Sequence, residues 1–169
     1  LSSCATQNSV TKYQPQFNFS DVQTYSMYEL NSKFGELQNL GHQMRNSIEL
    51  LIERKMEAKG YKYAAIEEAD VIVSYHLVGT DRTELRQYDL GTKYCAYCLK
   101  YNGDVQDYKK KQAEQGRVGN LILDLINTQN KRSVWRSSYP LKIKVKDNSA
   151  EVQEKLQQGI HSMLNDIPK

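Results

Sequence analysis

No segment constrains the fold more than residues 119–145, which read GNLILDLINTQNKRSVWRSSYPLKIKV. Two stretches rich in apolar residues flank a short polar segment, Asn127 to Arg132, whose composition is typical of a turn. This pattern predicts an antiparallel β-hairpin. Because side chains alternate between the two faces of a strand, we expect Leu121, Leu123 and Leu125 on one face of its first strand.

A helical period of three and four residues marks residues 31–62. Gly60 follows Lys59 at the position where a glycine commonly ends a helix. We therefore predict a long amphipathic helix that lies on a flat partner. Its apolar stripe consists of Leu37, Leu40, Met44, Ile48, Leu51, Ile52 and Met56.

A second amphipathic helix is predicted in DNSAEVQEKLQQGIHSMLNDIPK, at residues 147–169. Asn148 stands three residues before Glu151, which is the spacing of a capping box, and Pro168 ends the helical pattern. The apolar stripe of this helix consists of Val152, Leu156, Ile160, Met163, Leu164 and Ile167.

Two further segments are predicted to be strands. FNFSDVQTYSMY, at residues 17–28, alternates like a strand, with an irregularity near Ser20 and Asp21. ADVIVSYHLVG, at residues 69–79, is apolar on both faces, which favours a central strand. One or two weaker strands are expected in residues 83–101.

These elements together predict an α+β fold. We expect a two-layer sandwich, in which a mostly antiparallel sheet of about four to six strands carries two amphipathic helices on one face. The length of 169 residues is that of one domain. We assign residues 1–16 to an N-terminal tether and residues 17–169 to a single α+β domain.

The charge balance gives no indication of nucleic-acid binding. Lys and Arg number 23 against 20 for Asp and Glu, a net charge of +3, which is too mild to argue for such a partner. No stretch approaches the roughly 20 apolar residues that span a bilayer. If a membrane is involved, we expect attachment to it.

The first residues, LSSC, have the form of a lipobox, which ends the signal peptide of bacterial lipoproteins. In this interpretation Cys4 is lipidated, and the polar residues 5–16 form a solvated tether to the domain. Several acyl chains on Cys4 would hold the protein to a membrane essentially permanently. The uncharged Ala5 favours the outer membrane, facing the periplasm. The alternative is an ordinary frayed N-terminus that contains a cysteine.

Seven segments of the chain resemble one family: LSSCAT, NFSDVQTY, IERKMEAKGYK, ADVIVSYH, GNLILDLIN, SVWRSSY and MLNDIPK. This family is the bacterial lipoproteins catalogued as domain of unknown function 4136. The resemblance covers nearly the whole chain, except residues 85–116. It implies an exported, envelope-facing lipoprotein with an α+β domain, and it implies no active-site residues.

Cys95 and Cys98, in YCAYC, are the one pair that offers chemistry. With Cys4 lipidated, the two form a possible structural disulfide, although residues three apart on a straight strand point to opposite faces. Two free or intermolecular thiols are the next interpretation. Against a redox pair, no helix is predicted to begin directly after Cys98. Against a metal site, the three histidines are scattered over the chain and supply no further ligands. We expect no metal and no cofactor.

Other polar and aromatic residues have structural and functional interpretations. We expect His76 to be a strand residue whose ring hydrogen-bonds a neighbour, in preference to a catalytic base. We expect Trp135 to anchor the core, in preference to forming a ligand platform. Asp124 interrupts an apolar strand, so it is either a buried carboxylate of functional interest or an ordinary outward residue. A possible surface for a peptide, a glycan or another envelope protein is formed by Tyr88, Tyr94, Tyr97, Tyr101 and Tyr108.

The sequence therefore favours a lipid-anchored, periplasm-facing envelope protein with a non-catalytic binding or structural role. The alternative is a thiol-redox or metal-binding envelope protein that uses Cys95 and Cys98. A hydrolase built on a histidine with a serine or an aspartate has no motif to support it.

Overall fold

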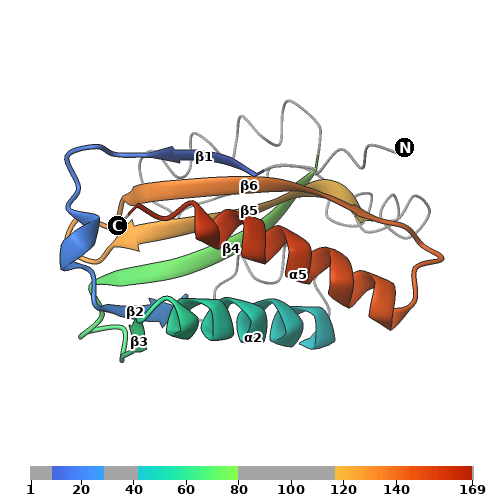
Figure 1. Cartoon of the computed structure of the whole chain (residues 1–169), viewed down its shortest axis with the longest axis horizontal. Coiled ribbons are helices and arrows are strands. Elements are labelled where there is room, and N and C mark those ends of the chain that lie inside the picture. The colour runs from blue at the N-terminus through green and yellow to red at the C-terminus, as the bar shows by residue number, and fades with distance from the viewer. Residues whose placement is uncertain (1–8, 29–41, 80–116, 169) are drawn as a thin grey trace.

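Six strands form one open sheet, and two helices lie side by side against one of its faces (Figure 1). The computed structural model describes residues 9–28, 42–79 and 117–168. The strand order across the sheet is β1-β6-β5-β4-β2-β3. In chain order the elements are β1 (Val10–Tyr13), the 3-10 helix η1 (Phe19–Asp21), β2 (Thr24–Met27), α2 (His42–Ala58), β3 (Lys62–Tyr63), β4 (Val71–Gly79), β5 (Arg117–Asn127), β6 (Ser133–Ile143) and α5 (Ser149–Asn165).

The predicted fold class is confirmed. The long pairings of β4 with β5 and of β5 with β6 are antiparallel, as is the short pairing of β1 with β6. On the other side of β4, the pairings of β2 with β4 and of β2 with β3 are parallel, so the sheet is mixed. The β5–β6 pair is the predicted hairpin, and β4 lies inside the sheet as its apolar sequence indicates.

The main core lies between the sheet and the two helices. Leu121, Leu123 and Leu125 of β5 point into it together, which confirms the predicted alternation. From α2 and α5 the core takes the buried side chains of the predicted stripes, including Ile48, Ile52, Met56, Leu156, Ile160, Met163 and Leu164. Burial of this apolar surface is the main force that holds the helices on the sheet.

Helix α2 ends where the sequence predicts. Gly60 has a φ of +93°, a conformation that glycine adopts without the steric cost of a side chain. Its N–H donates to Glu57 O (2.9 Å), and the N–H of Tyr61 donates to Met56 O (3.1 Å). This pair of hydrogen bonds satisfies two carbonyls that the last turn leaves free.

Helix α5 has the predicted capping box. The Glu151 N–H donates to Asn148 Oδ1 (2.9 Å), and the Asn148 N–H donates to Glu151 Oε2 (3.3 Å). Further along, Gly159 lets α5 approach β6 closely. A Cβ at this position would lie 2.7 Å from Cδ1 of the Tyr139 ring, so a larger residue would force the helix or the ring to shift.

Two N-terminal segments differ from the sequence prediction. Residues 17–23 are not extended throughout: η1 occupies Phe19–Asp21, capped by Asn18, and the strand begins only at Thr24. Val10–Tyr13, within the predicted tether, form β1, because β6 offers an unpaired edge to which even a polar segment can hydrogen-bond. The start of the first predicted helix and the weaker strands of residues 83–101 lie outside the described residues.

The sheet face opposite the helices is also buried at its centre. Ile72 of β4 and Ile126 of β5 are 1% and 0% exposed and form a small second cluster with Tyr28 and Ile66. Polar side chains of the central strands continue along this face. They are the candidate functional residues of the described part of the chain.

Candidate functional site

Four polar side chains from three adjacent strands share the sheet face opposite the helices. Ser74 on β4 stands opposite Asp124 on β5, and Asp124 stands opposite Arg136 on β6. His76 lies two residues beyond Ser74 and therefore on the same face. Ser74, His76 and Asp124 are each at most 2% exposed, so this polar cluster is shielded from water.

Asp124 is the centre of the polar cluster. Its Oδ1 accepts hydrogen bonds from Arg136 Nε (2.8 Å) and from the hydroxyl of Ser133 (2.6 Å). The Arg136 side chain is 20% exposed, whereas Asp124 is fully buried. The two side chains form a largely buried ion pair. Such a pair is costly to break, because the remaining charge then lacks compensation.

His76 is neutral at physiological pH. Burial lowers its pKa to about 4, and the positive charge of Arg136 acts in the same direction, while Asp124 acts against it. A neutral imidazole can accept or donate a hydrogen bond, but a pKa this low makes it a weak base. Between the two interpretations from the sequence, the burial of His76 therefore favours a structural strand residue over a base.

The polar cluster contains a serine, a histidine and an aspartate, but their arrangement does not activate the serine. The Ser74 hydroxyl is buried and has no hydrogen-bond partner among the described residues, so no base contacts it there. Asp124 is engaged by Arg136 and Ser133. We therefore interpret the polar cluster as structural. Its ion pair joins β5 to β6 on the face opposite the helices.

A second polar network connects the start of β1 to the end of α5, and the sequence analysis missed it. Asp166 Oδ2 accepts hydrogen bonds from the hydroxyls of Ser9 (2.7 Å) and Thr11 (2.8 Å). The Ser9 hydroxyl also lies 3.0 Å from that of Ser162, and the Thr11 hydroxyl lies 2.8 Å from that of Ser137. We call Ser9, Thr11, Ser137, Ser162 and Asp166 the N-terminal clamp. Small hydroxyl residues in a polar segment give no sequence signal for such a contact.

Replacing Asp166 with alanine should loosen the N-terminal clamp. The variant loses both hydrogen bonds of the carboxylate, which lies at the surface, so we expect a loss of only about 1 kcal/mol of stability. Amide exchange should accelerate in Val10–Tyr13 and remain slow in β5 and β6, as hydrogen–deuterium exchange can measure. Asp21→Ala, which removes an exposed carboxylate outside the clamp, should leave β1 protected; equal exchange in both variants would contradict the role of the clamp.

Trp135 is the core anchor that the sequence predicts. Its side chain is 1% exposed, and its indole N–H donates to the backbone carbonyl of Asp166 (3.3 Å). The other candidates fall elsewhere. Cys4, Cys95 and Cys98 lie outside the described residues, and so do Tyr88, Tyr94, Tyr97, Tyr101 and Tyr108.

A groove of about 590 Å³ lies between the beginnings of α2 and α5. Met44, Val152 and Leu156 form its apolar wall, and the amides of Gln43 and Gln153 lie along it. Of the described residues that line it, only Asp147 is titratable, and it pairs with Lys155 (2.6 Å). Such a lining suits binding better than acid–base chemistry.

Within the described residues, no group of three or more His, Cys, Asp or Glu side chains is placed to hold a metal ion. A search of the same residues finds no helix with the length and hydropathy to cross a bilayer.

Comparison with known proteins identifies a family and a fold. The model of a family described as Domain of unknown function (DUF4136) matches residues 9–169, and no curated protein sequence matches the chain. Three solved structures are similar in fold. The first, a PelC dodecamer from Paraburkholderia phytofirmans that carries a single substitution, has a TM-score of 0.52 at 12% identity, with 95% of this chain and 98% of that one covered.

The second is a DUF4136 family protein from Bacteroides thetaiotaomicron, with a TM-score of 0.51 at 18% identity, covering 95% of this chain and 92% of that one. The third is a PDZ domain protein from Parabacteroides distasonis, with a TM-score of 0.53 at 16% identity; the match covers 99% of this chain but 38% of that one. At these identities the similarity shows the shared fold alone.

Proposed function

The chain belongs to the family described as Domain of unknown function (DUF4136), and we propose that it is a lipid-anchored bacterial envelope domain that faces the periplasm. Its role in this proposal is to bind or organise other envelope components, and it catalyses no reaction. The lipobox sequence LSSC supports the anchor at Cys4, and Ala5 supports the outer membrane. Residues 5–8 would then connect that anchor to Ser9 and β1.

The N-terminal clamp is the structural observation that best supports the proposed anchor. Ser9, five residues after Cys4, bonds to two residues near the end of α5, and β1 then pairs with β6. In a domain that is held to a membrane by its N-terminus, any force on the anchor reaches the sheet through this segment, so its attachment bears that force. The clamp supplies that attachment through hydrogen bonds at the end of α5 and a strand pairing.

The polar cluster supports a non-catalytic role. Ser74, His76 and Asp124 are buried, and the Ser74 hydroxyl contacts no base among the described residues. The groove between α2 and α5 offers an apolar wall to a ligand or partner. One solved protein of this fold, PelC, is a dodecamer, which makes self-association the first form of structural role to examine, by light scattering after size-exclusion chromatography.

Replacing Cys4 with serine tests the anchor. When the chain is expressed from its complete gene in a bacterial host, the wild type should sediment with membranes, and the detergent-free soluble fraction should contain almost none of it. Cys4→Ser removes the thiol that accepts lipid, so this variant, exported behind a signal peptide that is cleaved without lipidation, should move to the soluble fraction. A wild type and a variant that distribute identically would contradict a lipid anchor at Cys4.

A further inference from the structure

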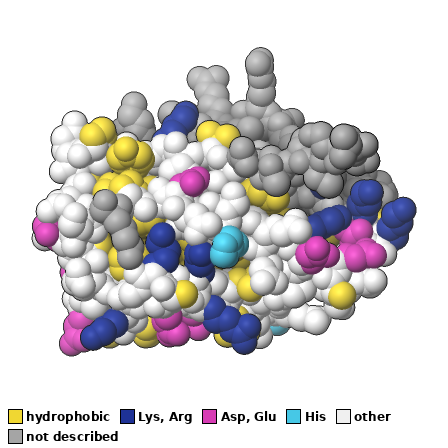
Figure 2. Space-filling model, viewed as in Figure 1, with side chains coloured by type: hydrophobic (Ala, Val, Ile, Leu, Met, Phe, Trp, Pro, Cys, Tyr) yellow, Lys and Arg dark blue, Asp and Glu magenta, His cyan; other side chains and the backbone are white. Residues whose placement is uncertain are grey.

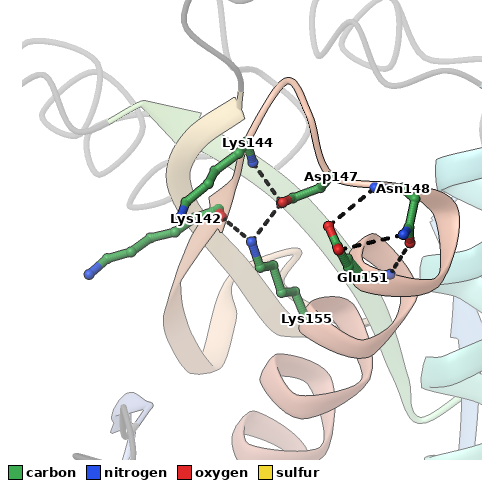
Figure 3. A network of polar contacts seen from close by, with 6 residues as sticks. All are labelled: Lys142, Lys144, Asp147, Asn148, Glu151 and Lys155. Carbon is green, nitrogen blue, oxygen red and sulfur yellow. Dashed lines mark hydrogen bonds and ion pairs between the residues drawn. The ribbon is translucent and has the colours of Figure 1, made fainter.

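The connection between β6 and α5 is a tight turn held by a polar network (Figure 3). The Asp147 N–H donates to Lys144 O (3.1 Å), which closes the turn, and the Lys144 N–H donates back to Asp147 Oδ2 (2.7 Å). From α5, Lys155 Nζ donates to the same Oδ2 (2.6 Å) and to Lys142 O (2.7 Å). Residues 144–147 are therefore fixed to both the sheet and the helix.

Asp147 remains charged in this network. The hydrogen bond from Lys155 and the backbone N–H of Lys144 lower its pKa below the ordinary value. The charge of Lys155 is thus compensated within the network, whereas no ion pair among the described residues engages the lysines at the surface of the turn.

The turn presents one apolar and several basic side chains to the surroundings. Val145, at the apex, is 66% exposed, which is the highest value among the exposed large apolar residues of the described chain. Lys142, Lys144 and Lys146 are exposed and take part in no ion pair among the described residues. Figure 2 shows Lys and Arg side chains gathered at this end of the molecule, with Asp and Glu side chains beside them. We call Lys142, Lys144, Val145 and Lys146 the basic turn.

The chain that precedes β1 points along the sheet toward the basic turn. β1 and β6 are antiparallel, and Val10 stands opposite Ser138. Followed backwards from Val10, the chain therefore leaves β1 in the direction in which β6 runs towards Lys142. Val10 is the sixth residue after Cys4, and that length of chain reaches at most about 20 Å. The six residues from Ser138 to Lys144 span a similar length, about 20 Å, so this reach allows an anchor at Cys4 to lie beside the basic turn.

We infer that the basic turn contacts the anionic phospholipid headgroups of the leaflet that holds the anchor. This inference rests on the proposed lipid anchor. Lysines close to an anionic bilayer are attracted to its surface, and an exposed valine between them can enter the boundary between headgroups and acyl chains. The second contact orients the domain, so that the hairpin turn at residues 127–132 and β3, at the opposite end in Figure 1, face away from the bilayer.

Vesicle binding of the unlipidated full chain tests the inference. Cys4→Ser protein is mixed with vesicles of equal parts phosphatidylethanolamine and phosphatidylglycerol, and the bound fraction is measured by co-sedimentation at low salt. Each lysine near an anionic surface contributes about fivefold to the partition coefficient, so Lys142→Gln, Lys144→Gln and Lys146→Gln together should weaken binding roughly a hundredfold. Binding should also vanish on vesicles of phosphatidylcholine alone.

The matched control removes the same charge from the other end of the sheet. Lys62, Lys131 and Arg132 are exposed residues of β3 and the hairpin turn, and their combined change to glutamine should leave most of the binding intact. Equal losses in both triple variants would overturn the inference, because binding would then follow net charge alone. Failure of the unlipidated wild type to bind either vesicle would overturn it as well.

The proposed anchor and the proposed headgroup contact can be refuted independently of each other. Vesicle binding uses no lipidated protein, whereas the membrane fractionation of the wild type and Cys4→Ser does not depend on Lys142, Lys144 or Lys146. If Cys4 is lipidated but the unlipidated protein does not bind anionic vesicles, the proposed function stands and the headgroup contact of the basic turn is refuted. Binding to a soluble polyanion such as polyglutamate but not to vesicles would also refute a headgroup partner.

Discussion

Arg136→Met should lower the free energy of unfolding by about 3 kcal/mol. The substitution keeps most of the apolar stem of the side chain but leaves the charge of Asp124, which is 0% exposed, without the guanidinium beside it. Breaking a buried ion pair from one side typically costs about 3 to 5 kcal/mol, and the 20% exposure of Arg136 places this pair at the lower limit. Urea denaturation of the wild type and the variant measures the difference.

The double variant Asp124→Leu, Arg136→Met separates the pair from the packing around it. Because no charge then remains buried, it should recover most of the stability that Arg136→Met loses. Ser133 loses one acceptor but keeps the carbonyl of Trp135, 3.1 Å from its hydroxyl. Lys155→Met, which breaks the more exposed pair with Asp147, should cost much less than Arg136→Met. An Arg136→Met variant as stable as the wild type would contradict the structural role of the polar cluster.

The stability of the protein should fall between pH 6.5 and pH 4 because of His76. Burial lowers its pKa from 6.5 to about 4, so in this window the unfolded chain binds a proton that the folded chain does not. The contribution of neutral His76 is therefore complete above pH 6.5 and is lost as the pH falls through the window. The shift corresponds to about 3 kcal/mol over the full range.

His76→Gln isolates this contribution from the other groups that titrate in acid. The difference in unfolding free energy between the wild type and this variant should change by about 3 kcal/mol across the window, with the wild type losing more stability at low pH. Asp124 on β5 and Arg136 on β6 remain in place, so their charges act in both proteins. His161→Gln, at an exposed position of α5, should keep the wild-type dependence. Parallel curves for the wild type and His76→Gln would contradict a buried neutral histidine.

Local patterns were sufficient to predict the larger elements. The hairpin follows from two alternating segments around a turn, and α5 follows from the spacing of Asn148 and Glu151 before an apolar stripe. Gly60 ends α2 because its φ of +93° is one that other residues rarely adopt. In each case the residues that decide the structure are close together in the sequence.

The remaining features depend on contacts between distant residues. Val10–Tyr13 form a strand because β6 presents a free edge, and nothing in their own sequence demands it. Asp124 is visible in the sequence as an interruption of an apolar strand, but only the register with Arg136 makes it an ion pair. The N-terminal clamp joins Ser9 to Asp166 across nearly the whole chain, so no local pattern could predict it.

Intact-mass analysis of the protein purified from membranes, after expression from its complete gene in a bacterial host, tests the central claim most directly. A lipid-anchored protein should begin at Cys4, without Leu1, Ser2 and Ser3, and its mass should include the acyl chains on that cysteine. A chain that retains these three residues and carries an unmodified Cys4 would contradict the anchor, and with it the proposed place of this domain in the cell envelope.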